Sequence, residues 1–177
     1  EVHWPAKSVL HILHVACCTV RTLLRGRCNH GRQPARLVVC CYAVVHGDKR
    51  GRKLGFPTIN LELKDIIVPK YGIYSCMIKV LSSDFQDIYK GVASIGTKPT
   101  FGENEANCEV HIFDFSESIY NKKVIVSLVK FQRDEIKYES IEKLKIQMKK
   151  DCEIAINNLS KNELLKDEKK FLEKHTT

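Results

Sequence analysis

Apolar positions between residues 42 and 133 fall into short runs rich in β-branched and aromatic side chains. Such runs, bounded by turn residues, predict β-strands. The predicted strands are YAVVHG at 42–47, TINLEL at 58–63, IYSCMIKV at 73–80, IYKGVASIG at 88–96, CEVHIF at 108–113 and KVIVSLVKF at 123–131. Because side chains alternate along a strand, Tyr74, Cys76, Ile78 and Val80 should share one face, with Ser75 and Lys79 on the other.

Turn-forming residues separate these runs. They are PKYG at 69–72, SSDFQD at 82–87, KPTFGENEAN at 98–107 and SESIYNKK at 116–123. No long helical pattern intervenes, so neighbouring strands should pair antiparallel. The pattern therefore predicts a mainly β domain, a small barrel or sandwich.

The period changes after residue 139. In SIEKLKIQMKKDCEIAINNL, at 140–159, apolar residues recur at spacings of three and four: Ile141, Leu144, Met148, Cys152, Ala155 and Leu159. This predicts an amphipathic helix packed on the sheet, with Ser140 as N-cap. The more charged ELLKDEKKFLEKH at 163–175 predicts a second helix or a tail.

Residue usage divides the chain near residue 41. Residues 1–41 hold six cations against one anion, a net +5 of the total +8, which leaves +3 for the rest. The N-terminal part is rich in arginine and poor in acids, as in a transit peptide, and could also be a spurious extension. We expect three regions: an atypical extension at 1–41, a main domain at 42–160 and a charged helix or tail at 161–177.

Cysteine spacing does not favour a metal site. Five of the eight cysteines lie in the first 41 residues, and no C-x-x-C pair occurs. Cys28, His30, Cys40 and Cys41 could be assembled into a zinc set, but adjacent cysteines fit tetrahedral spacing poorly. We therefore expect reduced cysteines in an intracellular, cytoplasmic protein.

Charge and hydropathy restrict the partners. No apolar run approaches the ~18 residues of a membrane span. A net charge of +8 favours anionic partners, but most of it lies in the extension, so the near-neutral main domain argues against nucleic acid. We expect small-molecule substrates, no membrane, no nucleic acid and a monomer.

A glycine-rich, cationic stretch, GDKRGRKLGFPTINLEL, carries the first candidate chemistry. Gly47, Gly51 and Gly55 allow backbone amides to approach an anion closely. Positive charge comes from Lys49, Arg50, Arg52 and Lys53, and Pro57 stiffens the exit. Thr58 and Asn60 share a strand face, and their oxygens suit Mg²⁺. The alternative is a hairpin turn with solvated lysines.

Two later stretches add a carboxylate and an arginine. In CEVHIFDF, Glu109 could act as a general base toward an alcohol, or could simply face solvent. In FQRDEIKY, Arg133 is the one arginine after residue 52, which suggests a task for a planar guanidinium. The alternative is a surface ion pair with Asp134 or Glu135.

Taken in order, these stretches resemble the riboflavin kinase family, and most closely the kinase module of bacterial bifunctional riboflavin kinase/FAD synthetase. The resemblance spans roughly residues 42–157 and rests above all on GFPTIN followed by E-V-H-I. It also includes VPKYGIYSCMIKV, GVASIGTKPTFG, IYNKKVIVSLVKFQRDEIKY and SIEKLKIQMKKDCEIA.

The resemblance implies a six-stranded antiparallel Greek-key β-barrel with a C-terminal helix. It implies transfer of the γ-phosphate of ATP to the ribityl 5′-hydroxyl of riboflavin, giving FMN, with Mg²⁺ as cofactor. Matching the family's motifs makes Glu109 catalytic and Thr58 and Asn60 the metal ligands. The ATP-binding residues would be Gly47, Gly51, Arg52, Lys53, Gly55, Pro57 and Thr58, and the flavin-binding residues Thr100, Phe101, His111 and Arg133.

The chain departs from the bifunctional enzymes in one respect. Their adenylyltransferase motif, of the G-x-F-D-G-x-H-x-G-H type, does not occur in this sequence. We therefore expect FMN synthesis without FAD synthesis. The alternatives are a flavin-binding fragment of the bifunctional enzyme and a basic β-barrel that binds nucleic acid.

Overall fold

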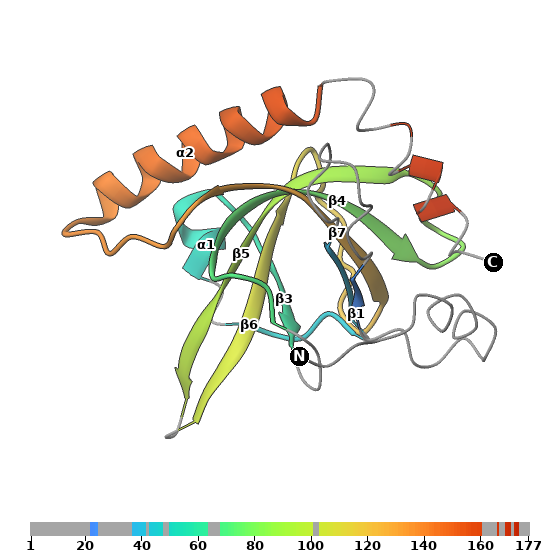
Figure 1. The fold of residues 1–177 in the computed structure, drawn as a ribbon, viewed down its shortest axis with the longest axis horizontal. Coiled ribbons are helices and arrows are strands. Elements are labelled where there is room, and N and C mark those ends of the chain that lie inside the picture. The colour runs from blue at the N-terminus through green and yellow to red at the C-terminus, as the bar shows by residue number, and fades with distance from the viewer. Residues whose placement is uncertain are drawn as a thin grey trace, which may run out of the picture.

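The computed structural model describes residues 22–24, 37–41, 43–47, 50–63, 68–100, 103–160, 166, 169–170 and 172–173. Its centre is one antiparallel sheet with the strand order β1-β2-β7-β4-β5-β6-β3 (Figure 1). The strands are β1 Thr22–Leu24, β2 Leu37–Cys41, β3 Ile59–Glu62, β4 Gly72–Leu81, β5 Ile88–Thr100, β6 Glu103–Ile112 and β7 Lys123–Arg133. The mainly β fold with a C-terminal helix is confirmed.

The sheet has seven strands where the resemblance implied six. β1 and β2 both lie in residues for which no strand was predicted, and they pair with each other. β2 in turn pairs with β7 along its whole length, so residues ahead of position 42 belong to the sheet. The expected division at residues 41 and 42 stays a prediction, as does the division at 160 and 161.

The strand predicted at 42–47 was wrong: the described residues 43–47 form only an isolated bridge, at Val45, because they connect distant parts of the sheet instead of running along one strand. The Val45 amide donates to the Asn60 carbonyl of β3 at 2.9 Å. On the other side, Val44 exchanges backbone hydrogen bonds with residues 121 and 122, both at 3.1 Å, just before β7. This segment therefore ties β3, at one edge of the sheet, to the start of β7.

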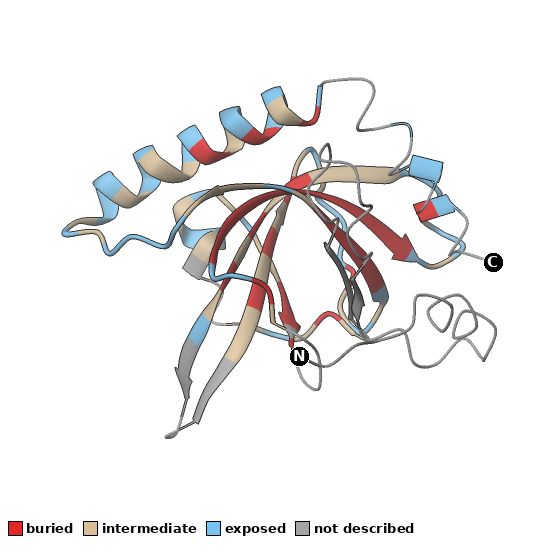
Figure 2. Cartoon of the chain, viewed as in Figure 1, coloured by how far each residue is buried: buried red, intermediate tan, exposed pale blue. Residues whose placement is uncertain are grey.

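The concave face of the sheet encloses the main core (Figure 2). On β4, Cys76, Ile78 and Val80 point inward and are fully buried, as their alternation predicted. Burial raises the pKa of the Cys76 thiol far above its ordinary value. Leu61 of β3 and Val110 of β6 enter the same core, and both are 0% exposed.

The outer face of β4 is buried too, which the alternation did not predict. Ser75 and Lys79 do face away from the core, but Ser75 is 0% and Lys79 is 6% exposed. Ser75 Oγ accepts hydrogen bonds at 3.0 Å from Gln132 and from Asn158 of the C-terminal helix. The Lys79 ammonium donates to the backbone carbonyls of Phe85 and Gln86. A covering helix and a covering loop thus replace solvent on this face.

The covering helix is α2, Ile141–Asn158. Ser140 caps it as predicted, because its side chain accepts the Lys143 amide at 3.2 Å. Ala155 and Leu159 are buried against the outer face of the sheet, but Ile141 is 58% exposed. Its assignment to the buried stripe was wrong, since the buried residues of α2 lie in its second half.

The β5–β6 connection also differs from the prediction. Residues 98–107 were expected to form a turn, but backbone pairing continues out to Thr100 and Glu103. The two strands project beyond the core as a long hairpin (Figure 1). Pairing between the strands outweighs the turn preference of the individual residues.

None of the helices in the described ranges is long and apolar enough to cross a membrane.

A buried ion pair joins the end of the sheet to α2. Arg133 donates from Nε to Asp151 Oδ1 at 2.9 Å and from Nη2 to Oδ2 at 2.6 Å. Gln147 donates to the same carboxylate at 2.9 Å. The hydrogen bonds that the guanidinium donates to Asp151 are the main cause of its raised pKa. The carboxylate partner of Arg133 is thus Asp151 of α2, whereas the neighbouring Asp134 accepts from Nη1 through its backbone carbonyl at 2.9 Å.

Asp151→Asn should destabilise the fold, because it leaves the partly buried Arg133 cation without its counter-charge. We expect the free energy of unfolding in urea to fall by about 3 kcal/mol. The matched control is Glu139→Gln, which removes an exposed helix ion pair with Lys143 and should cost less than about 0.5 kcal/mol. Equal effects of the two substitutions would show that the Arg133–Asp151 pair has no special part in docking α2.

Candidate active site

Two candidate residues face each other across neighbouring strands. Asn60 of β3 and Glu109 of β6 are direct backbone partners, and Ser94 of β5 is the next partner in the same row. Their sequence neighbours Leu61 and Val110 point into the core. Because side chains alternate, the row lies on the outer face of the sheet. The structure therefore brings together the proposed base and a proposed metal ligand from positions 49 residues apart in sequence.

Asn60 is covered although it lies on the outer face, with only 6% of its surface exposed. Gly47 lies directly against its side-chain amide, and a β-carbon at position 47 would overlap it. The absence of a side chain at Gly47 thus leaves room for the Asn60 amide. This is the close backbone approach that a glycine permits and any other residue would block.

Glu109 has a neighbour that the sequence reasoning did not single out. The Asn107 side chain, two residues earlier on the same face of β6, donates to Glu109 Oε1 at 3.4 Å. The spacing of two along a predicted strand could have identified it. A hydrogen-bond donor beside a carboxylate helps to orient it.

The glycine-rich stretch folds back over the start of β3. It contains a short helix, α1 Arg50–Leu54, where the sequence suggested only a loop or turn. After α1 the chain turns at Gly55, whose φ is +89°, and the Phe56 amide bonds back to the Gly51 carbonyl at 2.9 Å. The Thr58 hydroxyl lies beside Gly51, where a β-carbon would meet it at 3.3 Å. Glycine positions thus accommodate both predicted metal-ligating side chains.

Beside Thr58 the structure has a cavity of about 350 Å³. Arg52, Pro57 and Thr58 form one wall, and the loop at 115–120 forms the opposite wall. Ile59, Val110 and Ile112 supply apolar surface. On the loop side, the Tyr120 ring stacks on His46 with centroids 4.0 Å apart. A cavity of this size, with an apolar base and a few polar groups, is typical of small-ligand sites.

His111 lies next to the glycine-rich stretch. Its Nδ1 is 2.8 Å from the Pro57 carbonyl oxygen, and its ring packs against the edges of Phe56 and Phe113. The sequence resemblance had assigned it to the flavin. Two of its observed neighbours, Phe56 and Pro57, belong to the segment that leads into Thr58, and its assignment to the flavin stays a prediction.

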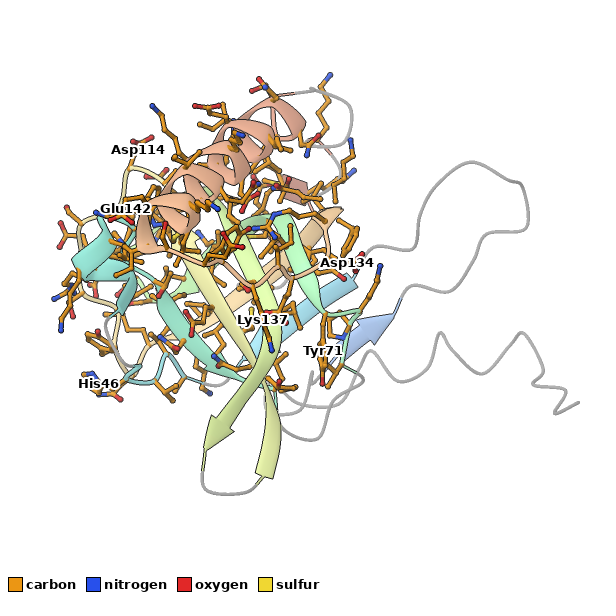
Figure 3. The ribbon with its side chains drawn as sticks, turned by 90° about the vertical axis from the view of Figure 1, so that its left-hand side faces the viewer. His46, Tyr71, Asp114, Asp134, Lys137 and Glu142 are labelled. Atoms are coloured by element: carbon orange, nitrogen blue, oxygen red, sulfur yellow. The ribbon has the colours of Figure 1, made fainter. Side chains whose placement is uncertain are left out.

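Of the other residues predicted to bind flavin, the structure describes Thr100 and Arg133, each at the end of a strand. Thr100 ends β5 at the far part of the hairpin, and Phe101 lies outside the described residues. Arg133 is held by Asp151 at the end of β7. The segment after Arg133 crosses back over the sheet, where the Glu135 carboxylate lies so close to Gly96 that a β-carbon there would overlap it. Figure 3 shows Lys137 of this segment in front of β5 and β6.

The donor atoms near Thr58 and Asn60 suit a hard cation. The described residues contain no cluster of three or more His, Cys, Asp or Glu side chains that could hold a metal. A hydroxyl and an amide oxygen are ligands that Mg²⁺ accepts while it keeps waters and takes phosphate oxygens. The residues present therefore fit a Mg²⁺ ion that arrives with a nucleotide.

Comparison with known proteins gives a consistent result. The riboflavin kinase family model matches residues 35–159. Over 112 residues the chain is 41% identical to the bifunctional riboflavin kinase/FMN adenylyltransferase of Haemophilus influenzae, covering 63% of this chain and 35% of that protein. The Bacillus subtilis protein of the same name is 40% identical over 121 residues, covering 66% and 37%.

The chain thus spans about a third of the length of these curated relatives. A solved structure described as a macrolide-efflux protein from Streptococcus pneumoniae has the same fold, with a TM-score of 0.60 and 37% identity. The likeness covers 70% of this chain and 39% of that one. The family match takes in β2 to β7, the glycine-rich stretch, the Asn60–Glu109 row and α2, and on this ground the chain belongs to the riboflavin kinase family.

Proposed function

We propose that this chain transfers the γ-phosphate of ATP to the 5′-hydroxyl of riboflavin, giving FMN and ADP. The family assignment supports the reaction class. The observation that carries the proposal is the cross-strand pairing of Asn60 with Glu109 next to the glycine-rich stretch. This pairing sets Glu109, a potential general base, beside Asn60, a potential metal ligand, and the glycine-rich stretch that could bind phosphate.

The nucleotide would occupy the cavity beside Thr58. The apolar surface of the cavity suits the adenine ring, and the wall with Arg52 and Thr58 suits the phosphates. Gly47, Gly51 and Gly55 allow backbone approach, Pro57 stiffens the exit, and Arg52 and Lys53 supply charge. A Mg²⁺ ion held by Thr58 and Asn60 would neutralise phosphate charge, which together with positioning is the main requirement of phosphoryl transfer.

Glu109 would act on the acceptor. The 5′-hydroxyl of riboflavin gives its proton to the Glu109 carboxylate as its oxygen attacks the γ-phosphorus, and ADP leaves with the electrons of the broken bond. Asn107 would hold the carboxylate in place through its hydrogen bond. No covalent intermediate on the protein is needed, since the two substrates react directly.

Riboflavin would lie on the outer face between the β5–β6 hairpin and the segment after Arg133. Thr100 comes from the hairpin side, and Glu135 and Arg133 come from the other side. The position of Glu135 against Gly96 supports this, because the segment already reaches the face that carries Glu109. The monomeric state and cytoplasmic location expected from the sequence are part of the same proposal.

The direct test is product formation. The purified chain is incubated with riboflavin, ATP and Mg²⁺, and the flavins are separated by chromatography. FMN that appears in proportion to ADP supports the proposal. Riboflavin binding without FMN would reduce the chain to a flavin-binding domain, and no binding of either substrate would reject the proposal.

Glu109→Gln should remove the base while keeping the size of the side chain. We expect kcat to fall by about 10²- to 10⁴-fold, the usual contribution of a general base, with riboflavin affinity nearly unchanged. The rate of FMN formation in a stopped-time assay gives kcat, and a titration of flavin fluorescence gives the riboflavin affinity. Glu142→Gln, on the exposed face of α2, is the control. Near wild-type turnover in Glu109→Gln would show that another group accepts the proton.

Asn60→Ala should weaken binding of Mg²⁺-ADP, because it removes one of the two proposed protein ligands. We expect roughly a tenfold rise in Kd by calorimetry, in the range that loss of a charge-assisted contact gives.

Thr58→Val should likewise raise the Kd for Mg²⁺-ADP, whereas Thr58→Ser, which keeps the hydroxyl, should bind Mg²⁺-ADP almost normally. Equal binding by Thr58→Val and Thr58→Ser would contradict a metal-binding hydroxyl at this position.

A further inference from the structure

His111 is the one polar residue on the outer face of β6, among its described side chains, that the mechanism above does not use directly. It follows Glu109 by two residues on the same face, and its backbone partner on β5 is Val92. On the other side β6 pairs with β3, whose first paired residue is Ile59 opposite Val110. The His111 ring thus lies where the chain enters β3 from the glycine-rich stretch.

The hydrogen bond of His111 has a defined direction. A carbonyl oxygen can only accept, so the 2.8 Å contact with Pro57 requires the proton to be on Nδ1. The ring is held on two sides, by Phe56 at a centroid distance of 5.6 Å and by Phe113 at 5.7 Å. Both contacts are edge-on, an arrangement that aromatic rings prefer. The imidazole is therefore constrained in both rotation and tautomer.

The acceptor of this bond belongs to the peptide group that joins Pro57 to Thr58. Proline has no N–H, so its carbonyl is the one backbone group through which Pro57 can be held. Because a peptide unit is planar, fixing this carbonyl also fixes the Thr58 amide and restricts the direction of the Thr58 side chain. Phe56, one residue earlier, is held independently by its bond to Gly51.

We propose that His111 is a positioning residue: its Nδ1–H anchors the Pro57 carbonyl to β6 and so orients Thr58 toward Mg²⁺-ATP. The role rests on the function proposed above. It differs from a flavin contact, because its effect should appear on the nucleotide side of the reaction. It also connects the two halves of the site, since His111 and Glu109 belong to one strand.

The test compares two side chains that place an amide nitrogen differently. In His111→Asn the amide nitrogen can take the place of Nδ1, whereas in His111→Gln it reaches the position of Nε2. We expect His111→Gln to raise the KM for Mg²⁺-ATP by roughly three- to tenfold, the range for loss of one hydrogen bond. His111→Asn should stay near wild type, and both variants should keep the wild-type KM for riboflavin.

Two kinetic outcomes would overturn the proposal. If Asn and Gln raise the KM for Mg²⁺-ATP equally, the Nδ1 bond is not what matters. If the KM for riboflavin rises instead, His111 contacts the flavin. Urea unfolding of both variants checks that neither difference comes from lost stability.

The hydrogen bond from His111 to the Pro57 carbonyl can also be tested on the unmodified protein, by a measurement that does not depend on catalysis. Nitrogen-15 NMR of the imidazole, at a pH where it is neutral, distinguishes the two tautomers. The Nδ1–H form supports the anchor, and the Nε2–H form overturns it. If the wild-type chain made no FMN, the proposed function would fail while this spectrum would still decide whether His111 holds Pro57.

Discussion

The backbone register between β3 and β6 is the constraint on which the site depends. It places Asn60 opposite Glu109, and a slip of β3 by one residue would turn Asn60 toward the core and leave Glu109 without it. The register is maintained from the other face of the same strands, where Leu61 and Val110 are fully buried. Apolar packing inside the sheet thus determines which polar groups meet outside it.

Two polar anchors then fix the irregular segments that border this face. His111 holds the exit of the glycine-rich stretch through the Pro57 carbonyl. Arg133, itself held by Asp151 of α2, donates from Nη1 to the Asp134 carbonyl at the start of the segment after β7. Neither segment is part of the sheet, so backbone pairing alone does not position it. Each anchor is a side chain on a strand face or at a strand end. It therefore fixes residues that would contact the substrates relative to the sheet.

The sequence predicted the elements whose pattern is local. The alternation in β4 identified its core face, and the spacing of three and four together with Ser140 identified α2. The order of the motifs identified the family. Thr58, Asn60 and Glu109 were named from residue type and spacing, and the pairing of Asn60 with Glu109 supports that choice without testing their roles.

What the sequence did not reveal depends on contacts between distant segments. The burial of Ser75 and Lys79 follows from a helix and a loop that cover them. The carboxylate partner of Arg133 comes from α2, 18 residues later, whereas the sequence suggested an ion pair with the adjacent Asp134 or Glu135. The bond from His111 to Pro57 spans 54 residues, and no local signal marks it.

The most direct test of the account is the structure of the dead-end complex with riboflavin and Mg²⁺-ADP. We expect the metal at Thr58 and Asn60, the nucleotide in the cavity between Arg52 and the loop at 115–120, and the ribityl 5′-oxygen within hydrogen-bond distance of Glu109. A flavin bound away from Glu109, or a nucleotide whose phosphates do not approach Thr58 and Asn60, would contradict it.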